Sequence, residues 1–174
     1  MKIVIICGSR RPQSQTRRLT DIAFEHAKKK TDDVNYIDLG KTEIDNFRGF
    51  DEKYSNVTNN AVKLIETADV IIIGSPIYNA LPSSGIKNLF EFVNYKALEG
   101  KVAAFIIKAG SQGTLQQVRG HLVALTNYFD IISNPKVVFS SDEDFEGDKL
   151  KNDNIRKRII DMVDSTIRMK EVLS

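Results

Sequence analysis

The first residues whose side chains could bind a ligand or take part in a reaction lie in the loop Gly8–Thr16, directly after the N-terminal hydrophobic segment. The loop carries three hydroxyl groups and two guanidinium groups, on Ser9, Ser14, Thr16, Arg10 and Arg11. It is expected to connect a buried strand to a helix, where unpaired backbone N–H groups and the helix dipole favour an anion. These donors suit the dianion of a phosphate monoester, although helix capping alone would explain Ser14 or Thr16. The predicted phosphate-binding residues are Ser9, Arg11, Ser14, Gln15 and Thr16.

Three other phosphate-binding loops are tested by the residues that they require. A Walker loop needs a glycine and a lysine at fixed spacing after Gly8, and neither is present. The dinucleotide fingerprint G-x-G-x-x-G would need glycine where Arg10 and Gln13 stand. A low-molecular-weight tyrosine phosphatase would use Cys7 as nucleophile, with an arginine where Gln13 stands. Because that arginine would stabilise the transferred phosphoryl group, its absence makes Cys7 a small buried hydrophobic residue instead.

A second group follows the third hydrophobic segment. Tyr78 can form an aromatic wall for a flat heteroaromatic ring, and the Asn79 amide can both donate and accept hydrogen bonds. Pro76 and Pro82 stiffen the backbone, whose N–H groups could stabilise negative charge that develops on such a ring. An ordinary loop with a surface tyrosine is the alternative. The predicted ring-binding residues are Pro76, Ile77, Tyr78 and Asn79.

A third loop, Lys108–Thr114, follows the fourth hydrophobic segment. Its two glycines allow the backbone to approach a ring closely, although a flexible turn is the alternative. We predict that this loop borders the ring through Gly110, Ser111, Gln112 and Gly113.

The elements that position these loops alternate between strands and helices. Strands are predicted over Lys2–Cys7, Val34–Leu39, Val70–Gly74, Val102–Ile107 and Val137–Phe139. Helical spacing of apolar residues marks segments 15–30, 61–68, 86–93 and 115–125, and a last helix from about Asn154 to the C-terminus. Segments 40–58 and 76–85 are predicted to be loops. This alternation predicts an α/β fold with a five-stranded parallel sheet, ordered 2-1-3-4-5 and covered by helices on both faces. Residues 1–174 are expected to form one domain.

In that order the chain reverses direction between the first and third strands. A ligand crevice is expected there, at the carboxyl ends of the strands. The first two loops should therefore meet at one site, which favours the phosphate and the ring being parts of one mononucleotide.

Composition limits the possible partners and compartments. The chain of 174 residues has a formal net charge of +2, too small to indicate nucleic acid or an anionic membrane as a partner. Cys7 is the only cysteine, so no intrachain disulfide is possible. The N-terminal hydrophobic run is too short for a signal sequence or a membrane span. A cytoplasmic protein is the expectation.

Two further features carry no predicted function. The acidic run Asp142–Asp148 superficially suggests a calcium loop, but a strand precedes it and position twelve is Asp153 instead of glutamate. We expect a solvated acidic loop. His26 and His121 lie on predicted helices without companions at metal-ligand spacing, so we expect ordinary helix positions and no metal.

The paired motifs resemble those of the NAD(P)H-dependent FMN reductases. The first is Gly8-Ser9-x-Arg11-x-x-Ser14-x-Thr16, and the second is Ser75-Pro76-Ile77-Tyr78-Asn79 with Gly85-x-Lys87-Asn88. The resemblance covers nearly the whole chain. Many members have asparagine where this chain has Thr16, and glutamate where it has Ile77.

The resemblance implies a flavodoxin-like fold, bound FMN, and a homodimer or homotetramer. It also implies hydride transfer from NADPH or NADH to FMN, and electron transfer onward to a flavin, quinone, azo compound or metal ion. A flavodoxin-type electron carrier that reacts slowly with NAD(P)H is the main alternative, and a phosphatase dependent on Cys7 is a further one.

Overall fold

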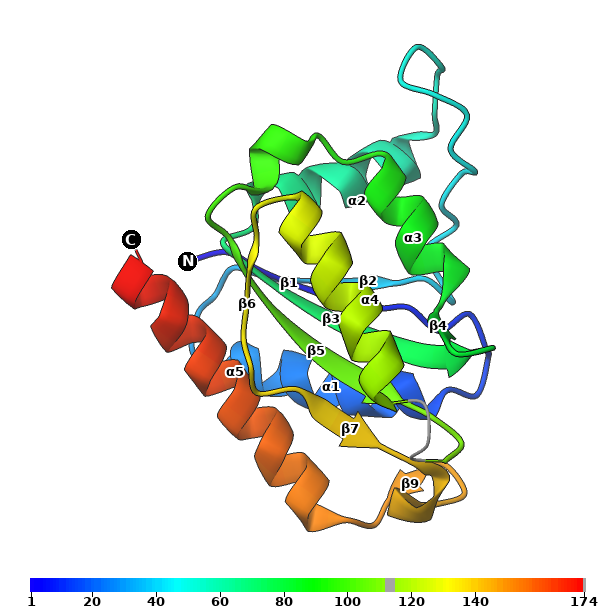
Figure 1. Ribbon diagram of the computed structural model, residues 1–174, viewed down its shortest axis with the longest axis vertical. Helices are drawn as coiled ribbons and strands as arrows, with labels where there is room; N and C mark the ends of the chain where they lie inside the picture. Colours follow the sequence, from blue (N-terminus) through cyan, green and yellow to red (C-terminus); the bar gives the residue numbers. More distant parts are fainter. Residues whose placement is uncertain (112–114, 174) are drawn as a thin grey trace.

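The computed structural model describes residues 1–111 and 115–173, without the side chain of residue 115. Its centre is a mostly parallel sheet in the order β2-β1-β3-β5-β6 (Figure 1). The main strands are β1 (Ile3–Cys7), β2 (Val34–Asp38), β3 (Val70–Tyr78) and β5 (Val102–Lys108). Two short segments, β6 (Ile132–Ser133) and β7 (Val138–Ser140), pair with β5 in succession and fill the fifth position. The α/β class and the predicted strand order are confirmed.

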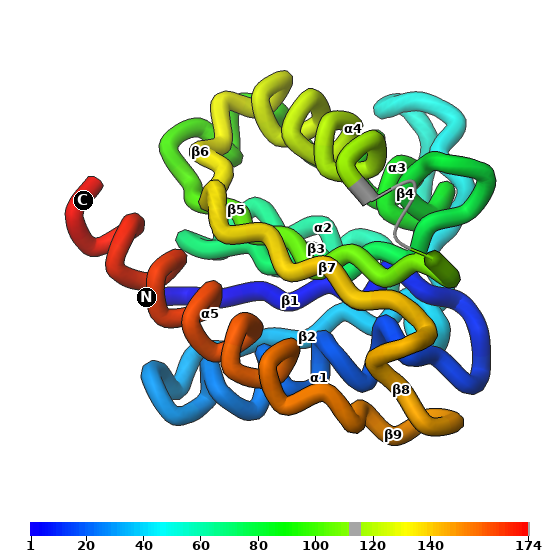
Figure 2. Tube along the Cα trace, turned by 60° about the horizontal axis from the view of Figure 1, so that its bottom comes forward, coloured from blue at the N-terminus to red at the C-terminus, as the bar shows by residue number. Residues whose placement is uncertain are grey.

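Helices cover both faces of this sheet, giving three layers (Figure 2). One face carries α1 (Gln15–Ala27) and α5 (Asp153–Leu173). The other carries α2 (Asn56–Thr67), α3 (Ser84–Glu91) and α4 (Leu115–Tyr128), with a short 3-10 helix, η1 (Tyr95–Leu98), after α3. Side chains that alternate along each strand serve the two layers. Ile3 and Ile5 pack with α1 and α5, whereas Val4 and Ile6 pack with α2 and α3.

The segment predicted as a loop over 76–85 is mostly ordered secondary structure, so that prediction is wrong. β3 continues to Tyr78, a tight turn follows, and β4 (Leu81–Pro82) pairs back antiparallel to it. Pro76 lies opposite Lys108 of β5 in parallel register, although proline usually interrupts a strand. Asn79 and Ala80 form the turn with φ of 48° and 65°. These left-handed angles match the strand twist of a two-residue hairpin.

Three other predicted boundaries differ. α2 begins at Asn56 rather than after 58, because Ser55 Oγ caps it by accepting the N–H of Thr58 at 3.2 Å. α1 ends at Ala27 rather than at about 30. The segment predicted as a solvated acidic loop instead forms a 3-10 helix, η3 (Asp142–Asp144), and a hairpin of β8 (Phe145–Glu146) and β9 (Lys149–Leu150). Pairing of β8 with β9 closes the hairpin, and burial of Phe145 holds the hairpin against the main sheet.

Close packing of α1 on β3 fixes where α1 begins. A Cβ atom at Gly74 would lie 2.1 Å from Thr20 Cγ2 and 3.5 Å from Thr16 Cγ2. Only glycine therefore lets the helix approach the strand this closely. The first turn of α1 consequently lies beside the carboxyl end of β3. Among the described residues, no helix is long and apolar enough to cross a membrane.

Candidate functional site

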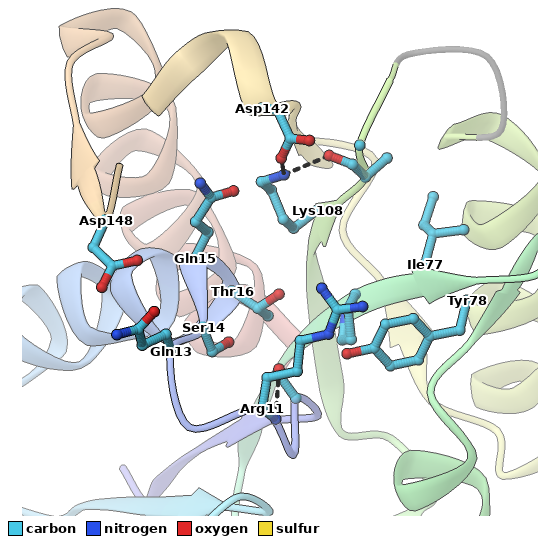
Figure 3. A pocket seen from close by; sticks show the side chains of 14 residues that line it. Arg11, Gln13, Ser14, Gln15, Thr16, Ile77, Tyr78, Lys108, Asp142 and Asp148 are labelled. Carbon is cyan, nitrogen blue, oxygen red and sulfur yellow. Dashed lines mark hydrogen bonds and ion pairs between the residues drawn. The ribbon is translucent and has the colours of Figure 1, made fainter. Parts of the chain in front are cut away.

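A cavity of about 410 Å³ opens at the carboxyl ends of β1, β3 and β5 (Figure 3). It is lined by Ser9, Arg11, Gln13, Ser14, Gln15, Thr16, Pro76, Ile77, Tyr78, Lys108, Ala109, Gly110, Asp142 and Asp148. Its size lies within the range of small-ligand sites. The first and second predicted loops therefore meet in one cavity, as the strand order requires.

The loop before α1 presents backbone and hydroxyl donors to this cavity. Ser14 is the N-cap of α1, and its Oγ accepts the Arg17 N–H at 3.1 Å. Ser9 Oγ accepts the Arg11 N–H at 3.4 Å. The N–H groups of Gln15 and Thr16 lie in the first helical turn and have no carbonyl partner within the helix. An anion at this end of the cavity would meet these donors and the positive end of the helix dipole.

The two arginines of this loop lie in different surroundings. Arg11 lines the cavity, and its guanidinium carbon lies 5.3 Å from the centre of the Tyr78 ring. Arg10 lies instead beside Leu39, Gly40 and Lys41 in a separate depression after β2. Arg11 is therefore the arginine that can contribute charge inside the cavity.

Behind the loop lies a buried ion pair. Arg17 points away from the cavity to Asp38 at the end of β2, with Nε and Nη2 lying 2.5 and 3.0 Å from the two carboxylate oxygens. This hydrogen bonding raises the pKa of the Arg17 guanidinium above its ordinary value. The pair forms part of the floor under the loop and was not predicted from the sequence.

Lys108 is a further cavity residue that sequence reasoning missed. Its side chain is 7% exposed, and its Nζ lies 2.6 Å from Asp142 Oδ1, whose side chain is 66% exposed. The same Nζ donates to the carbonyl of Ala109. The signal was available, because Lys108 continues the alternation of Ala104 and Ile106 and so faces the α1 side. A buried ammonium in that register requires an acidic or carbonyl partner close to the cavity.

The acidic segment 142–148 also reaches the cavity, contrary to the expectation of a solvated loop. Asp142 and Asp148 line it, and Gln15 Nε2 donates to the carbonyl of Gly147 at 3.0 Å. Asp144 instead stabilises η3 internally. Burial opposes ionisation of Asp144, but hydrogen bonds from Ser141, Asn152 and Ser140 outweigh it and lower its pKa. Through these contacts segment 142–148 connects the start of α1 to the carboxyl end of β5.

The predicted site residues fall into three groups. Most of them line the cavity: Ser9, Arg11, Ser14, Gln15, Thr16, Pro76, Ile77, Tyr78 and Gly110. Asn79 lies in an adjoining groove, and Ser111 is exposed and does not line the cavity. Gln112 and Gly113 lie outside the described residues. Gln13, Lys108, Ala109, Asp142 and Asp148 line the cavity without having been predicted.

The adjoining groove shares Tyr78 with the cavity and has a volume of about 760 Å³. Besides Tyr78 and Asn79 it is lined by residues of β4, α3 and α4: Leu81, Pro82, Ser84, Ile86, Lys87, Asn88, Glu91, His121 and Leu125. A second hollow of about 720 Å³ continues it past Leu125 to Tyr128 and Phe50. The α3–α4 face is therefore a long, largely apolar surface that begins beside the cavity.

The position of Cys7 does not favour the phosphatase alternative. Cys7 is completely buried at the end of β1 and does not line the cavity. Burial raises the pKa of its thiol, so the thiolate nucleophile that a phosphatase needs is disfavoured. His26 lies far from the cavity, where its Nε2 is 2.8 Å from Asp164 Oδ1 on α5. Within the described ranges, no three His, Cys, Asp or Glu residues are grouped so that they could hold a metal ion.

Comparisons with known proteins agree with this geometry. A relative in Geobacillus thermodenitrificans, an NAD(P)H-dependent FAD/FMN reductase, is 24% identical over 139 residues, which cover 79% of this chain and 75% of the relative. An FMN-dependent NADPH-azoreductase of Staphylococcus aureus is 26% identical over 150 residues, covering 83% and 79%.

Among solved structures, an NADH:FMN oxidoreductase in its apo form superposes with a TM-score of 0.80 at 21% identity. The match covers 99% of this chain and 90% of that one. The two chains thus share one fold. The family model described as NADPH-dependent FMN reductase matches residues 1–146. With both predicted loops at one cavity, the chain belongs to the NADPH-dependent FMN reductase family.

Proposed function

We propose that this protein is an oxidoreductase that binds FMN in the described cavity, takes hydride from NADPH or NADH, and passes the electrons to a small acceptor. The observation that carries the proposal is the pairing of two unlike surfaces in one cavity. One end offers the N-terminus of α1, the other offers the Pro76–Tyr78 strand end with an aromatic ring, and Arg11 lies between them beside that ring. A mononucleotide has one phosphate and one flat ring, and this cavity suits both.

The chemistry of the donor set fits FMN. Ser9, Arg11, Ser14, Gln15 and Thr16 would hold the phosphate through N–H, hydroxyl and guanidinium donors. Pro76, Ile77, Tyr78 and Gly110 would border the ring. Asn79, Ser111, Gln112 and Gly113 would complete the ring site.

Bound FMN supplies the hydride-accepting and electron-transferring chemistry, and the chain supplies binding and orientation. Tyr78 presents its ring at the junction between the cavity and the adjoining groove. That junction can admit the nicotinamide and the acceptor in turn. The nearly enclosed ammonium of Lys108 neutralises Asp142, a carboxylate that would otherwise repel a dianionic phosphate in the same cavity. Flavins, quinones, azo compounds and metal ions are the acceptor classes that we propose.

A flavodoxin-type electron carrier is the second candidate, but it is less favoured. The relatives at 24–26% identity are named as reductases that use NAD(P)H.

The chain is also proposed to act as a homodimer or homotetramer through its α3–α4 face. Phe50, Tyr95 and Tyr128 are exposed along this face, and a continuous apolar surface of this kind marks an interaction site. Lys87 and Glu91 lie one helical turn apart, with Nζ and Oε1 2.6 Å apart, in both hollows of the face. A two-fold contact brings the same patch of both subunits together and is favoured by opposite charges within that patch, which Lys87 and Glu91 supply.

Residues 1–174 are proposed to form one FMN-binding domain that works in the cytoplasm. The family match ends at residue 146, but α5 packs on α1 through Ile155, Ile159 and Met162, in the same core as Leu19. One cooperative unfolding transition would support a single domain, and two separate transitions would contradict it. A lone, buried Cys7 suits a reducing compartment. Recovery of the chain outside the cytoplasmic fraction of its cells would contradict that location.

Purified protein supplied with FMN should retain it after removal of free flavin and show the visible bands of a flavoprotein. It should then oxidise NADPH or NADH rapidly when a quinone or azo acceptor is present. Absorbance spectra followed by steady-state turnover with each nucleotide check both points. Failure to bind FMN supplied in excess would overturn the proposal. Stable FMN binding with slow NAD(P)H oxidation would favour the electron carrier instead.

Arg11→Ala should weaken FMN binding by roughly 1–3 kcal/mol, because a hydrogen-bond donor to a charged phosphate is lost. Flavin fluorescence titration measures the affinity. Arg10→Ala is the matched control, since Arg10 lies in the other depression. Unchanged affinity in Arg11→Ala together with a loss in Arg10→Ala would show that the assigned register of the loop is wrong.

Sedimentation equilibrium should give at least twice the chain mass, and Tyr128→Glu should shift the protein to the monomer. Tyr128 is 71% exposed on the α3–α4 face, where a carboxylate would be desolvated by a partner. Val172→Glu is the control, because Val172 is 86% exposed near the end of α5 on the opposite layer. A wild-type chain that stays monomeric at all concentrations would contradict the oligomer.

A further inference from the structure

The structure assigns a further role to Arg17: it is a positioning residue that holds the phosphate loop in its anion-binding shape from behind. This inference rests on the proposed binding of FMN phosphate at the same loop. Arg17 does not line the cavity, so it cannot be one of the residues that touch the ligand there. Its action would be on the backbone of residues 11–13.

Arg17 makes a complete set of contacts on the buried side of the loop. Its Nε and Nη2 lie 2.5 and 3.0 Å from the two oxygens of Asp38. Its remaining terminal nitrogen, Nη1, donates to the carbonyls of Arg11 at 3.2 Å and Pro12 at 3.0 Å. The side chains of Arg17 and Asp38 are only 11% and 6% exposed. One planar guanidinium thus connects the end of β2 to two successive peptides of the loop.

Capture of these carbonyls determines what the other side of the loop presents. The chain has no cis peptide bond among its described residues, so the N–H of Gln13 points opposite to the carbonyl of Pro12. Because Arg17 holds that carbonyl on the β2 side, the Gln13 N–H is turned away from β2, and Gln13 itself lines the cavity. The peptide group between Arg11 and Pro12 has no N–H, because the proline nitrogen carries no hydrogen. Its carbonyl is therefore the only polar group that this peptide could turn toward the cavity. Turned toward the cavity, either carbonyl dipole would repel a phosphate.

The position of Arg17 is energetically unfavourable for a cation, which calls for a compensating role such as holding the loop. It lies in the first turn of α1, where the helix dipole disfavours a cation, and that turn contains no acidic residue. Burial of the ion pair adds a desolvation cost that the attraction between the two charges only partly offsets. A residue that breaks a local rule in this way is expected at a functional position. The contacts that compensate are those to Asp38 and to the loop carbonyls.

Gly40 shows how closely this arrangement is packed. A Cβ atom at Gly40 would lie 2.2 Å from Arg17 Nη2 and 3.2 Å from Asp38 Oδ1. The N–H of Gly40 also donates to Asp38 Oδ1 at 3.0 Å. A single added methyl group would therefore displace the guanidinium while leaving both charges in the chain.

The test compares FMN with riboflavin, which has the same ring and lacks the phosphate. Arg17→Lys keeps the charge but has no planar fork to reach the carboxylate and both carbonyls at once. In this variant the preference for FMN over riboflavin, measured as the ratio of their dissociation constants, should fall about tenfold or more. Riboflavin affinity itself should stay unchanged. Arg18→Lys is the matched control, because Arg18 is the exposed neighbour of Arg17 on α1.

A purely structural role would loosen the whole site and weaken both ligands together, leaving the ratio unchanged. That result in a folded Arg17→Lys chain would overturn the inference. If this variant does not fold, Asp38→Asn carries the same test: it keeps the shape of the side chain, removes the charge that anchors the guanidinium, and should lower the ratio. Wild-type protein that binds neither flavin would refute the proposed function instead, so the two failures are distinguishable.

Discussion

Backbone N–H groups at the start of α1 have no carbonyl partner within the helix, and much of the site is arranged around them. The parallel sheet places that helix start at the carboxyl end of β1, beside the end of β3. Gly74 lets α1 lie against β3 closely enough for both to share one cavity. Ser14 caps the helix, and Arg17, paired with Asp38, holds the loop segment that precedes the helix. The proposed anion recognition would thus depend on backbone geometry, with the charged side chains supporting it.

The two hollows beside Tyr78 differ in ways that would suit the cofactor and the reactants of the proposed reaction. The cavity at the helix start is polar and closely shaped, as suits a cofactor held in one orientation. The groove over β4, α3 and α4 is wider and largely apolar. A surface of that kind discriminates weakly between small aromatic reactants, which agrees with the range of acceptors proposed. Tyr78 lines both hollows, and the hairpin turn at Asn79 and Ala80 follows it directly.

Local patterns were sufficient to predict the strand order and the meeting of two loops. Buried β-branched runs such as Ile3–Cys7 and the helical spacing around Leu19 are local signals, and the sheet order follows from general rules of topology. The continuation of β3 through Pro76 was missed because it depends on pairing with β5, which lies far along the chain. Lys108 and Asp142 are 34 positions apart and meet only in the folded state. Arg17 was not singled out because its partner Asp38 lies 21 positions along the chain and meets it only in the folded state.

The central claim is that the phosphate and the ring of FMN occupy opposite ends of one cavity. Amide chemical shifts of labelled protein, titrated in parallel with FMN and with riboflavin, test it most directly. FMN should shift the amides of Gln13, Gln15 and Thr16 as well as that of Tyr78, whereas riboflavin should shift Tyr78 and leave the start of α1 nearly unchanged. Identical shifts with both ligands at Gln15 and Thr16, or shifts confined to the α3–α4 face, would contradict the account.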